Sequence, residues 1–195
     1  MSAPRGPYAK TSAKRELILR AALEIYAEAG SRKVSVRDVA KRVGMTDAGV
    51  LHHFGNRESL LTAVLQARDT LTREKYGDVL ANPASGAAML ADSVSTPGLV
   101  KLFLDIAAAA AEPEHPGHDY FAERYERFRH DTAESLARAQ PPDGPPPAVD
   151  SARAARLLLA AADGLQIQWL LEPEIDMAAD LEALHRVLLA ALRAS

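Results

Sequence analysis

The 195 residues include no cysteine and no long apolar run. Without cysteine the chain has no disulfides, thiolate zinc ligands or cysteine nucleophiles, although this leaves its redox compartment open. No stretch reaches the roughly 18 consecutive apolar residues that cross a bilayer, and the opening MSAPRGPYAK lacks the apolar run of a signal peptide. We therefore expect a soluble, cytoplasmic protein with no membrane partner.

The residue patterns of common catalytic sites are also missing. The chain has no Gly-x-Ser-x-Gly elbow, no phosphate-binding glycine loop and no pair of carboxylates at a catalytic helical spacing. We therefore do not expect an enzyme, and we expect no cofactor.

Charge is distributed unevenly along the chain. Residues 1–57 hold eleven Lys or Arg against five Asp or Glu, a balance of +6, whereas residues 58–195 hold twelve against twenty-one, a balance of −9. These balances sum to the net charge of −3. The basic first part suits a polyanionic partner, although a basic solvated face would give the same balance.

Apolar residues recur almost everywhere at helical spacing and nowhere alternate, which predicts an all-α fold. The first helix is expected from Thr11 or Ser12 to Gly30, because Gly30 suits the left-handed conformation that ends a helix. The later helices are predicted at 84–94, 98–111, 117–139, 151–171 and 177–193. Five prolines make PPDGPPP, residues 141–147, a stiff surface connection.

The stretch VRDVAKRVGMTDAGVLHHF, residues 36–54, predicts two short helices joined by a tight turn. Ser35 and Thr46 are the expected N-caps, Gly44 supplies the turn, and Ala40 is small where the helices cross. Asn56 is expected to cap a fourth helix. The apolar residues on its inner side are predicted to be Leu60, Leu61, Val64, Leu65 and Leu71.

This helix-turn-helix pattern resembles the TetR family of bacterial transcriptional regulators. The resemblance is carried by Ala40 and Gly44, the small pair Ala48 and Gly49, His53-Phe54, and Asn56, Arg57, Glu58, Leu60 and Leu61. It implies a three-helix DNA-binding domain at residues 1–56. Two positions depart from the family: Leu51 replaces a common tyrosine that donates to phosphate, and Arg57 replaces a common lysine.

By this resemblance, the second helix of the motif enters the major groove. The DNA-binding residues it implies are Thr46, Asp47, Ala48, Gly49, His52, His53 and Arg57. Asp47 is expected either to cap its own helix or to accept a proton from a cytosine amino group. Lys10, Lys14 and Arg37 are expected to attract the DNA backbone, the alternative being simple solvated charges.

Two histidine-containing stretches are candidate metal sites. Adjacent helical residues point about 100° apart, so His52 and His53 do not form one. The loop EPEHPGHD, residues 112–119, holds carboxylates and imidazoles close together, but its proline and glycine favour a solvated turn. We therefore expect no bound metal.

Residues 57–195 are expected to form a helical ligand-binding and dimerisation bundle. Phe103, Tyr125, Gln166 and Trp169 are the candidate ligand-binding residues, although the aromatics also suit a core or an interface. Broad apolar stripes on the last two helices predict a homodimer with a four-helix interface, to which each chain contributes two helices. We thus expect a homodimeric regulator, a repressor of a palindromic operator that is released by an unidentified small-molecule effector.

Overall fold

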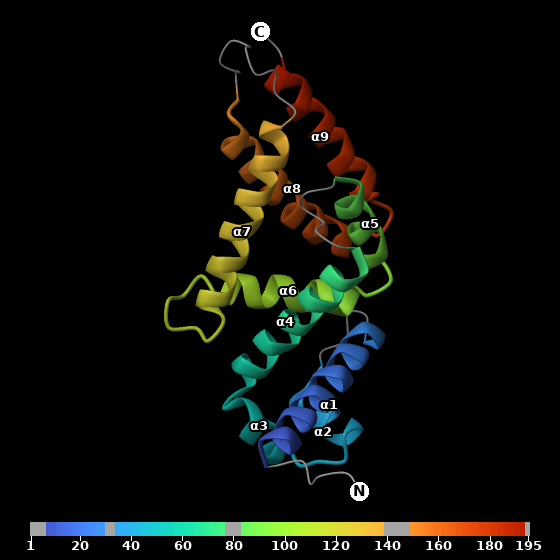
Figure 1. Cartoon of the computed structure of the whole chain (residues 1–195). Helices are drawn as coiled ribbons and strands as arrows, with labels where there is room; N and C mark the ends of the chain where they lie inside the picture. The colour runs from blue at the N-terminus through green and yellow to red at the C-terminus, as the bar shows by residue number, and fades with distance from the viewer. Residues whose placement is uncertain (1–6, 30–33, 77–82, 139–148, 194–195) are drawn as a thin grey trace, which may run out of the picture. The chain divides into compact units, whose positions relative to one another are not determined.

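The computed structural model describes residues 7–29, 34–76, 83–138 and 149–193, and within these ranges all regular structure is α-helical (Figure 1). The helices are α1 (Pro7–Glu28), α2 (Val36–Arg42), α3 (Asp47–Phe54), α4 (Arg57–Tyr76), α5 (Pro83–Ser93), α6 (Pro97–Ala109), α7 (His118–Ala137), α8 (Ser151–Leu171) and α9 (Met177–Arg193). The predicted all-α fold is confirmed. Gly30 and residues 141–147 lie outside the described ranges.

The chain forms two compact units. The first comprises Met1–Leu71 and Ser95–His118, and the second comprises Thr72–Val94 and Asp119–Ser195. Helix α6 therefore belongs with α1 to α3, although it follows them by more than 40 residues. The boundary predicted after residue 56 divides a DNA-binding part from a ligand-binding part and does not refer to compact units, so it stays a prediction.

The core of the first unit forms where α1 packs against α2, α3 and α6. Ile18, Ala22 and Ile25 are buried at the helical spacing that the sequence predicts. Helix α4 buries a continuous stripe from Leu60 to Leu65. This core includes the buried side of the helix-turn-helix formed by α2 and α3.

Two details of the first unit differ from expectation. Helix α1 begins at Pro7, earlier than Thr11, because proline is tolerated in the first turn of a helix. Leu71 was predicted to face inward but is 54% exposed. The buried residues of α4 end at Leu65, so Leu71, where the first segment of this unit ends, lies past the edge of its core.

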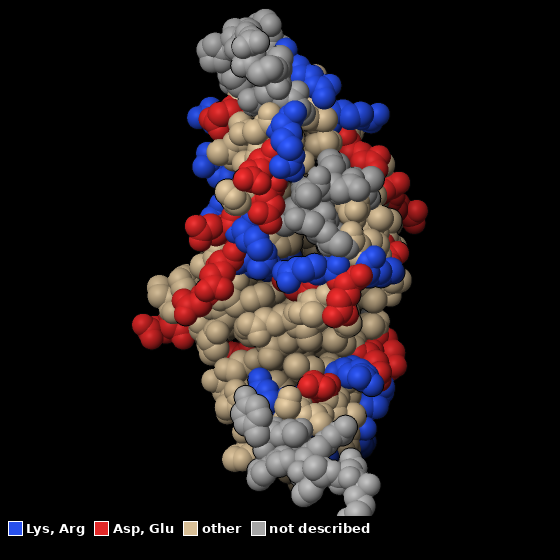
Figure 2. Space-filling view, in the orientation of Figure 1, with Lys and Arg blue, Asp and Glu red and all other residues tan. Residues whose placement is uncertain are grey.

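In the second unit, α9 packs against both α5 and α8. Its core cluster joins residues of α7, α8 and α9, namely Leu136, Ala154, Ala155, Leu158, Leu188 and Leu192. In contrast, the outward face of α7 is covered by charged side chains of both signs (Figure 2). No helix in the described ranges is long and apolar enough to span a membrane.

Candidate nucleic-acid interface

The turn between α2 and α3 has the geometry that the sequence predicts. Gly44 adopts a φ of +66°, in the left-handed region, and the Met45 amide donates to the Ala40 carbonyl at 2.9 Å. Ala40 is 1% exposed where the helices cross, and Val50 of α3 is fully buried. The turn therefore fixes α3 against α2 and leaves the opposite face of α3 outward.

Three side chains cap these helices as predicted. Ser35 and Asp38 form a reciprocal capping box at α2. The Thr46 hydroxyl accepts from the Gly49 amide at 3.0 Å, and the Asn56 Oδ1 accepts from the Ser59 amide at 2.7 Å. Because a hydroxyl is also a donor, exposed Thr46 can still donate its proton to a phosphate.

Replacement of Gly44 by alanine should destabilise this turn. We expect Gly44→Ala to lower the free energy of unfolding by about 1 kcal/mol, which corresponds to a fall in Tm of about 2–4 °C, because a Cβ disfavours the left-handed region. Among the described residues beyond Gly44 and its two chain neighbours, no atom lies within 4 Å of the position of that Cβ, so the penalty is conformational. Thermal unfolding followed by circular dichroism measures it. Gly44→Asn is the control and should retain more stability, since asparagine tolerates this region; an equal loss would contradict the explanation.

All nine predicted DNA-binding residues lie in the first unit, on α1 to α4 or at their ends. Arg37, Thr46, Ala48, His52 and Arg57 are exposed. Lys14, Asp47, Gly49 and His53 are partly buried. Lys10 lies in α1, and its side chain is outside the described set. The arrangement leaves polar and small side chains of α3 accessible.

Asp47 is the first residue of α3, and its carboxylate pairs with Arg37 at 3.4 Å. The side-chain cap of α3 is formed by Thr46. Asp47 still favours the positive end of the helix through its charge. That Asp47 contacts a cytosine amino group stays a prediction. The ion pair with Arg37 partly neutralises the Asp47 carboxylate.

The histidines of this unit make local contacts. The rings of His52 and His53 lie edge to face, with centroids 6.0 Å apart. In the loop before α7, His115 Nδ1 accepts from the Gly117 amide at 3.0 Å. His118 Nδ1 donates to the Ala110 carbonyl at 2.9 Å. These bonds organise the turn, and the described residues contain no group of three metal-ligating side chains.

Arg15 is a contact residue of α3 that the sequence did not single out. Its guanidinium donates to the His53 carbonyl and lies over the Phe54 ring. The two ends of this hydrogen bond are 38 positions apart, so no local pattern points to it.

A second polar cluster lies in the second unit. The Tyr125 hydroxyl of α7 donates to Asp163 Oδ2 of α8 at 2.6 Å. Burial raises the pKa of the Asp163 carboxyl, although Tyr125 and Arg124 oppose the shift. Burial and Asp163 also raise the pKa of Tyr125. A half-buried acid in such surroundings is a candidate functional residue, and the sequence did not single out Asp163.

Gln166 and Trp169 lie on the same helix as Asp163 and are both buried. The Gln166 amide donates to the Ala162 carbonyl at 3.1 Å. The Trp169 Nε1 is buried and has no hydrogen-bond acceptor among the described residues. Phe103 belongs to the first unit, so its predicted grouping with these residues in one pocket stays a prediction.

The raised pKa of Asp163 predicts a pH-dependent stability effect. A carboxyl whose pKa is higher in the folded state than its ordinary 3.8 destabilises the fold above that value. We therefore expect Asp163→Asn to raise the free energy of unfolding at pH 7, because the buried charge is removed. The gain should shrink as the pH falls through the raised pKa of the folded state, and it should vanish below about 3.8, where the acid becomes protonated in both states.

Denaturant unfolding at several pH values tests this expectation. Glu182→Gln changes an exposed acid of α9 and should leave stability within about 0.5 kcal/mol of the unaltered protein. An Asp163→Asn protein that is less stable at pH 7 would show that the charged form is favoured in the fold.

The helix-turn-helix and the helices that follow it define a class of two-part, all-α DNA-binding proteins. Residues 18–64 match the family described as bacterial regulatory proteins, tetR family, and residues 84–194 match the one described as BetI-type transcriptional repressor, C-terminal. The second match spans more than half of the chain. The chain therefore belongs to the TetR family of bacterial regulatory proteins.

Characterised relatives match shorter regions. The transcriptional repressor KstR2 of Rhodococcus jostii is 31% identical over 85 residues, covering 44% of this chain and 42% of KstR2. The repressor AcnR of Corynebacterium diphtheriae is 32% identical over 115 residues, covering 59% of this chain and 48% of AcnR. The chain thus spans less than half the length of these two relatives.

Solved structures support the fold over nearly the whole chain. A TetR transcription regulator from Haloarcula marismortui superposes with a TM-score of 0.66 at 20% identity, covering 93% of this chain and 97% of that one. FadR of Thermus thermophilus, solved with lauroyl-CoA, gives a TM-score of 0.56 at 20% identity, covering 93% and 96%. At this identity the similarity concerns the fold alone.

Proposed function

We propose that the chain is a homodimeric transcriptional repressor that binds a palindromic operator and is released by a small-molecule effector. The observation that carries the proposal is the capped helix-turn-helix, which leaves Thr46, Ala48 and His52 exposed on or beside α3. The names of KstR2 and AcnR as repressors support it. The proposal includes a cytoplasmic location and a regulatory rather than an enzymatic role.

Binding to random-sequence duplex DNA tests the first part of the proposal. Lys14, Arg37 and Arg57 on each of two chains supply enough cations for about six phosphate contacts. Affinity should then fall by about 10³-fold between roughly 50 and 200 mM salt, as counterion release requires. A helical adaptor or an enzyme has no reason to bind, so absence of binding at both salt concentrations would contradict the proposal.

Exposed apolar side chains on α8 and α9 support dimerisation. The apolar stripes that the sequence shows are partly used inside the chain, since Leu158, Leu188 and Leu192 are buried. A separate set remains exposed: Leu157 (47%), Ile167 (51%), Leu171 (78%) and Val187 (65%). On α8 these side chains lie on one face with Ala160 and Gly164, where small residues permit close helix packing.

Helix α4 is the proposed link between operator and effector. It starts at Arg57 in the first unit and ends at Tyr76 in the second, so a single helix runs through both. Its end is fixed within the second unit, where Asp92 of α5 binds both Lys75 and Tyr76. A coupling of about 1–3 kcal/mol between effector and DNA is enough for release.

The polar cluster of α7 and α8 is the proposed effector site. Tyr125, Asp163 and Gln166 supply oriented polar groups, and Trp169 supplies a buried donor that needs an acceptor. The lauroyl-CoA in the FadR structure shows that this fold accommodates an organic ligand in at least one case. Because Trp169 is the single tryptophan of the chain, its fluorescence reports ligands that reach this site.

A further inference from the structure

Helix α3 depends on the rest of the first unit for its orientation. It has only eight residues, Asp47–Phe54, and its buried residues are Val50 and Phe54. A helix of this length is not stable alone in water. The angle at which it meets DNA is therefore set by the side chains that hold its two ends.

The amino-terminal end of α3 is held by Thr46 and by the turn at Gly44, whereas its carboxyl-terminal end is held by Arg15 of α1. The guanidinium carbon of Arg15 lies 4.2 Å from the centroid of the Phe54 ring. The same group donates to the carbonyl of His53, one of the last four carbonyls that no amide within the helix satisfies. A cation at this end is also favoured by the helix dipole.

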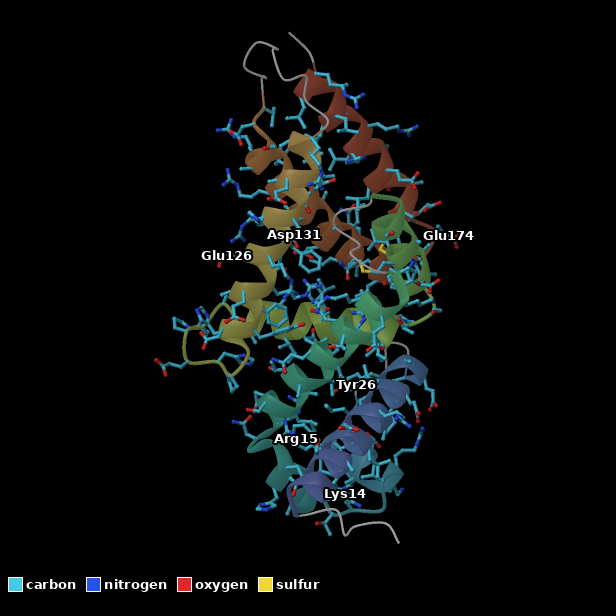
Figure 3. All side chains as sticks on the ribbon, viewed as in Figure 1. Lys14, Arg15, Tyr26, Glu126, Asp131 and Glu174 are labelled. Carbon is cyan, nitrogen blue, oxygen red and sulfur yellow. The ribbon has the colours of Figure 1, made fainter. Side chains whose placement is uncertain are left out.

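The neighbouring Lys14 differs in its contacts. Both residues lie in the amino-terminal half of α1 (Figure 3), but adjacent helical residues point about 100° apart. In the ranges that the structure describes, the Lys14 side chain has no ion pair or hydrogen bond. The Lys14 charge is thus available to DNA, whereas the Arg15 charge is engaged with α3.

We propose that Arg15 is a positioning residue for DNA recognition: it fixes the carboxyl-terminal end of α3, and it does so through protein contacts rather than through phosphate. This inference rests on the proposed DNA-binding function. It requires the planar guanidinium, because one group must stack on Phe54 and donate to His53 at the same time. An ammonium group at the same place is a weaker partner for both.

The test compares Arg15→Met, Arg15→Lys and the matched control Lys14→Met. The probes are a duplex that the unaltered protein enriches from a random pool and a scrambled duplex of equal length. For Arg15→Met we expect affinity for the enriched duplex to fall about tenfold. Affinity for the scrambled duplex, and the slope of log affinity against log salt concentration (the salt slope), should be nearly unchanged, because no phosphate contact is lost. Arg15→Lys should not restore the preference.

Lys14→Met should behave in the opposite way. This substitution should lower the affinity for both duplexes equally and reduce the salt slope by about 2 per dimer, since each chain loses one phosphate contact. If Arg15→Met shows this same pattern, or if Arg15→Lys restores full preference, then Arg15 acts on phosphate and the proposal is overturned.

Two further measurements separate positioning from general stability and from the proposed function. Ile25→Val, a conservative core change in α1, should lower Tm without altering the preference for the enriched duplex; an altered preference would assign Arg15 a merely structural role. If the unaltered protein enriches no duplex, the proposed function fails, and amide hydrogen exchange then tests whether Arg15 positions α3. If the Arg15→Met substitution speeds the exchange of backbone amides in α3 alone, the inference is supported. Exchange that is unchanged, or faster throughout the protein, contradicts it.

Discussion

The double substitution Ile167→Glu and Val187→Glu is expected to convert the dimer into a monomer. Both side chains are more than half exposed in the single chain, at 51% and 65%, so carboxylates there should not unfold it. In the proposed interface the same carboxylates would be desolvated without partners, at a cost of several kcal/mol each. Light scattering should then report the 20.9 kDa of one chain instead of about twice that mass.

Loss of the dimer should also weaken operator binding. Two linked recognition helices gain about 10²- to 10⁴-fold in affinity over one, so we expect a loss of about 100-fold or more. Fluorescence anisotropy with a labelled operator measures it. Leu71→Glu adds the same charge at a side chain that is 54% exposed on α4 and should change neither mass nor affinity. A double variant that stays dimeric would place the interface elsewhere.

The second large effect is expected from Arg57→Ala. Arg57 is the first residue of α4, where the helix dipole disfavours a cation. Its guanidinium lies 3.7 Å from the carboxylate of Glu58, a surface ion pair that contributes little to stability. We expect affinity to fall by about 100-fold or more for every DNA sequence alike, because each chain of the proposed dimer would lose a charge-assisted bond to phosphate of about 1.5–3 kcal/mol. Two lost contacts per dimer should reduce the salt slope by about 2.

Variants at the same helix sharpen the Arg57 experiment. Arg57→Lys should keep much of the affinity, since the charge remains. Arg73→Ala removes an exposed cation near the other end of α4 and should leave DNA binding unchanged. A new sequence preference at unchanged affinity would show that Arg57 reads a base and not the backbone.

Features with a local cause could be predicted from the sequence. The caps at Ser35, Thr46 and Asn56 each depend on an amide three residues further on, and all three are present. The left-handed turn at Gly44 likewise follows from one residue and its neighbours. The helix-turn-helix was therefore predictable almost residue by residue.

Features that depend on distant residues could not be predicted. The contacts of Arg15 with His53 and of Tyr125 with Asp163 each join positions 38 residues apart. Periodicity likewise placed Leu71 inward, because it gives the direction of a side chain but not the point where the opposing core ends. Membership of α6 in the first unit also arises from long-range packing that local sequence does not encode.

Selection of binding sites from random duplexes tests the central claim most directly. If two copies of α3 read DNA from a two-fold symmetric dimer, the enriched sites should be inverted repeats, with half-sites spaced by about one helical turn of 34–36 Å or a multiple of it. Enrichment should vanish for the Ile167→Glu, Val187→Glu monomer. Enrichment of asymmetric, non-repeated sites by the unaltered protein, or of no site at all, would contradict the claim.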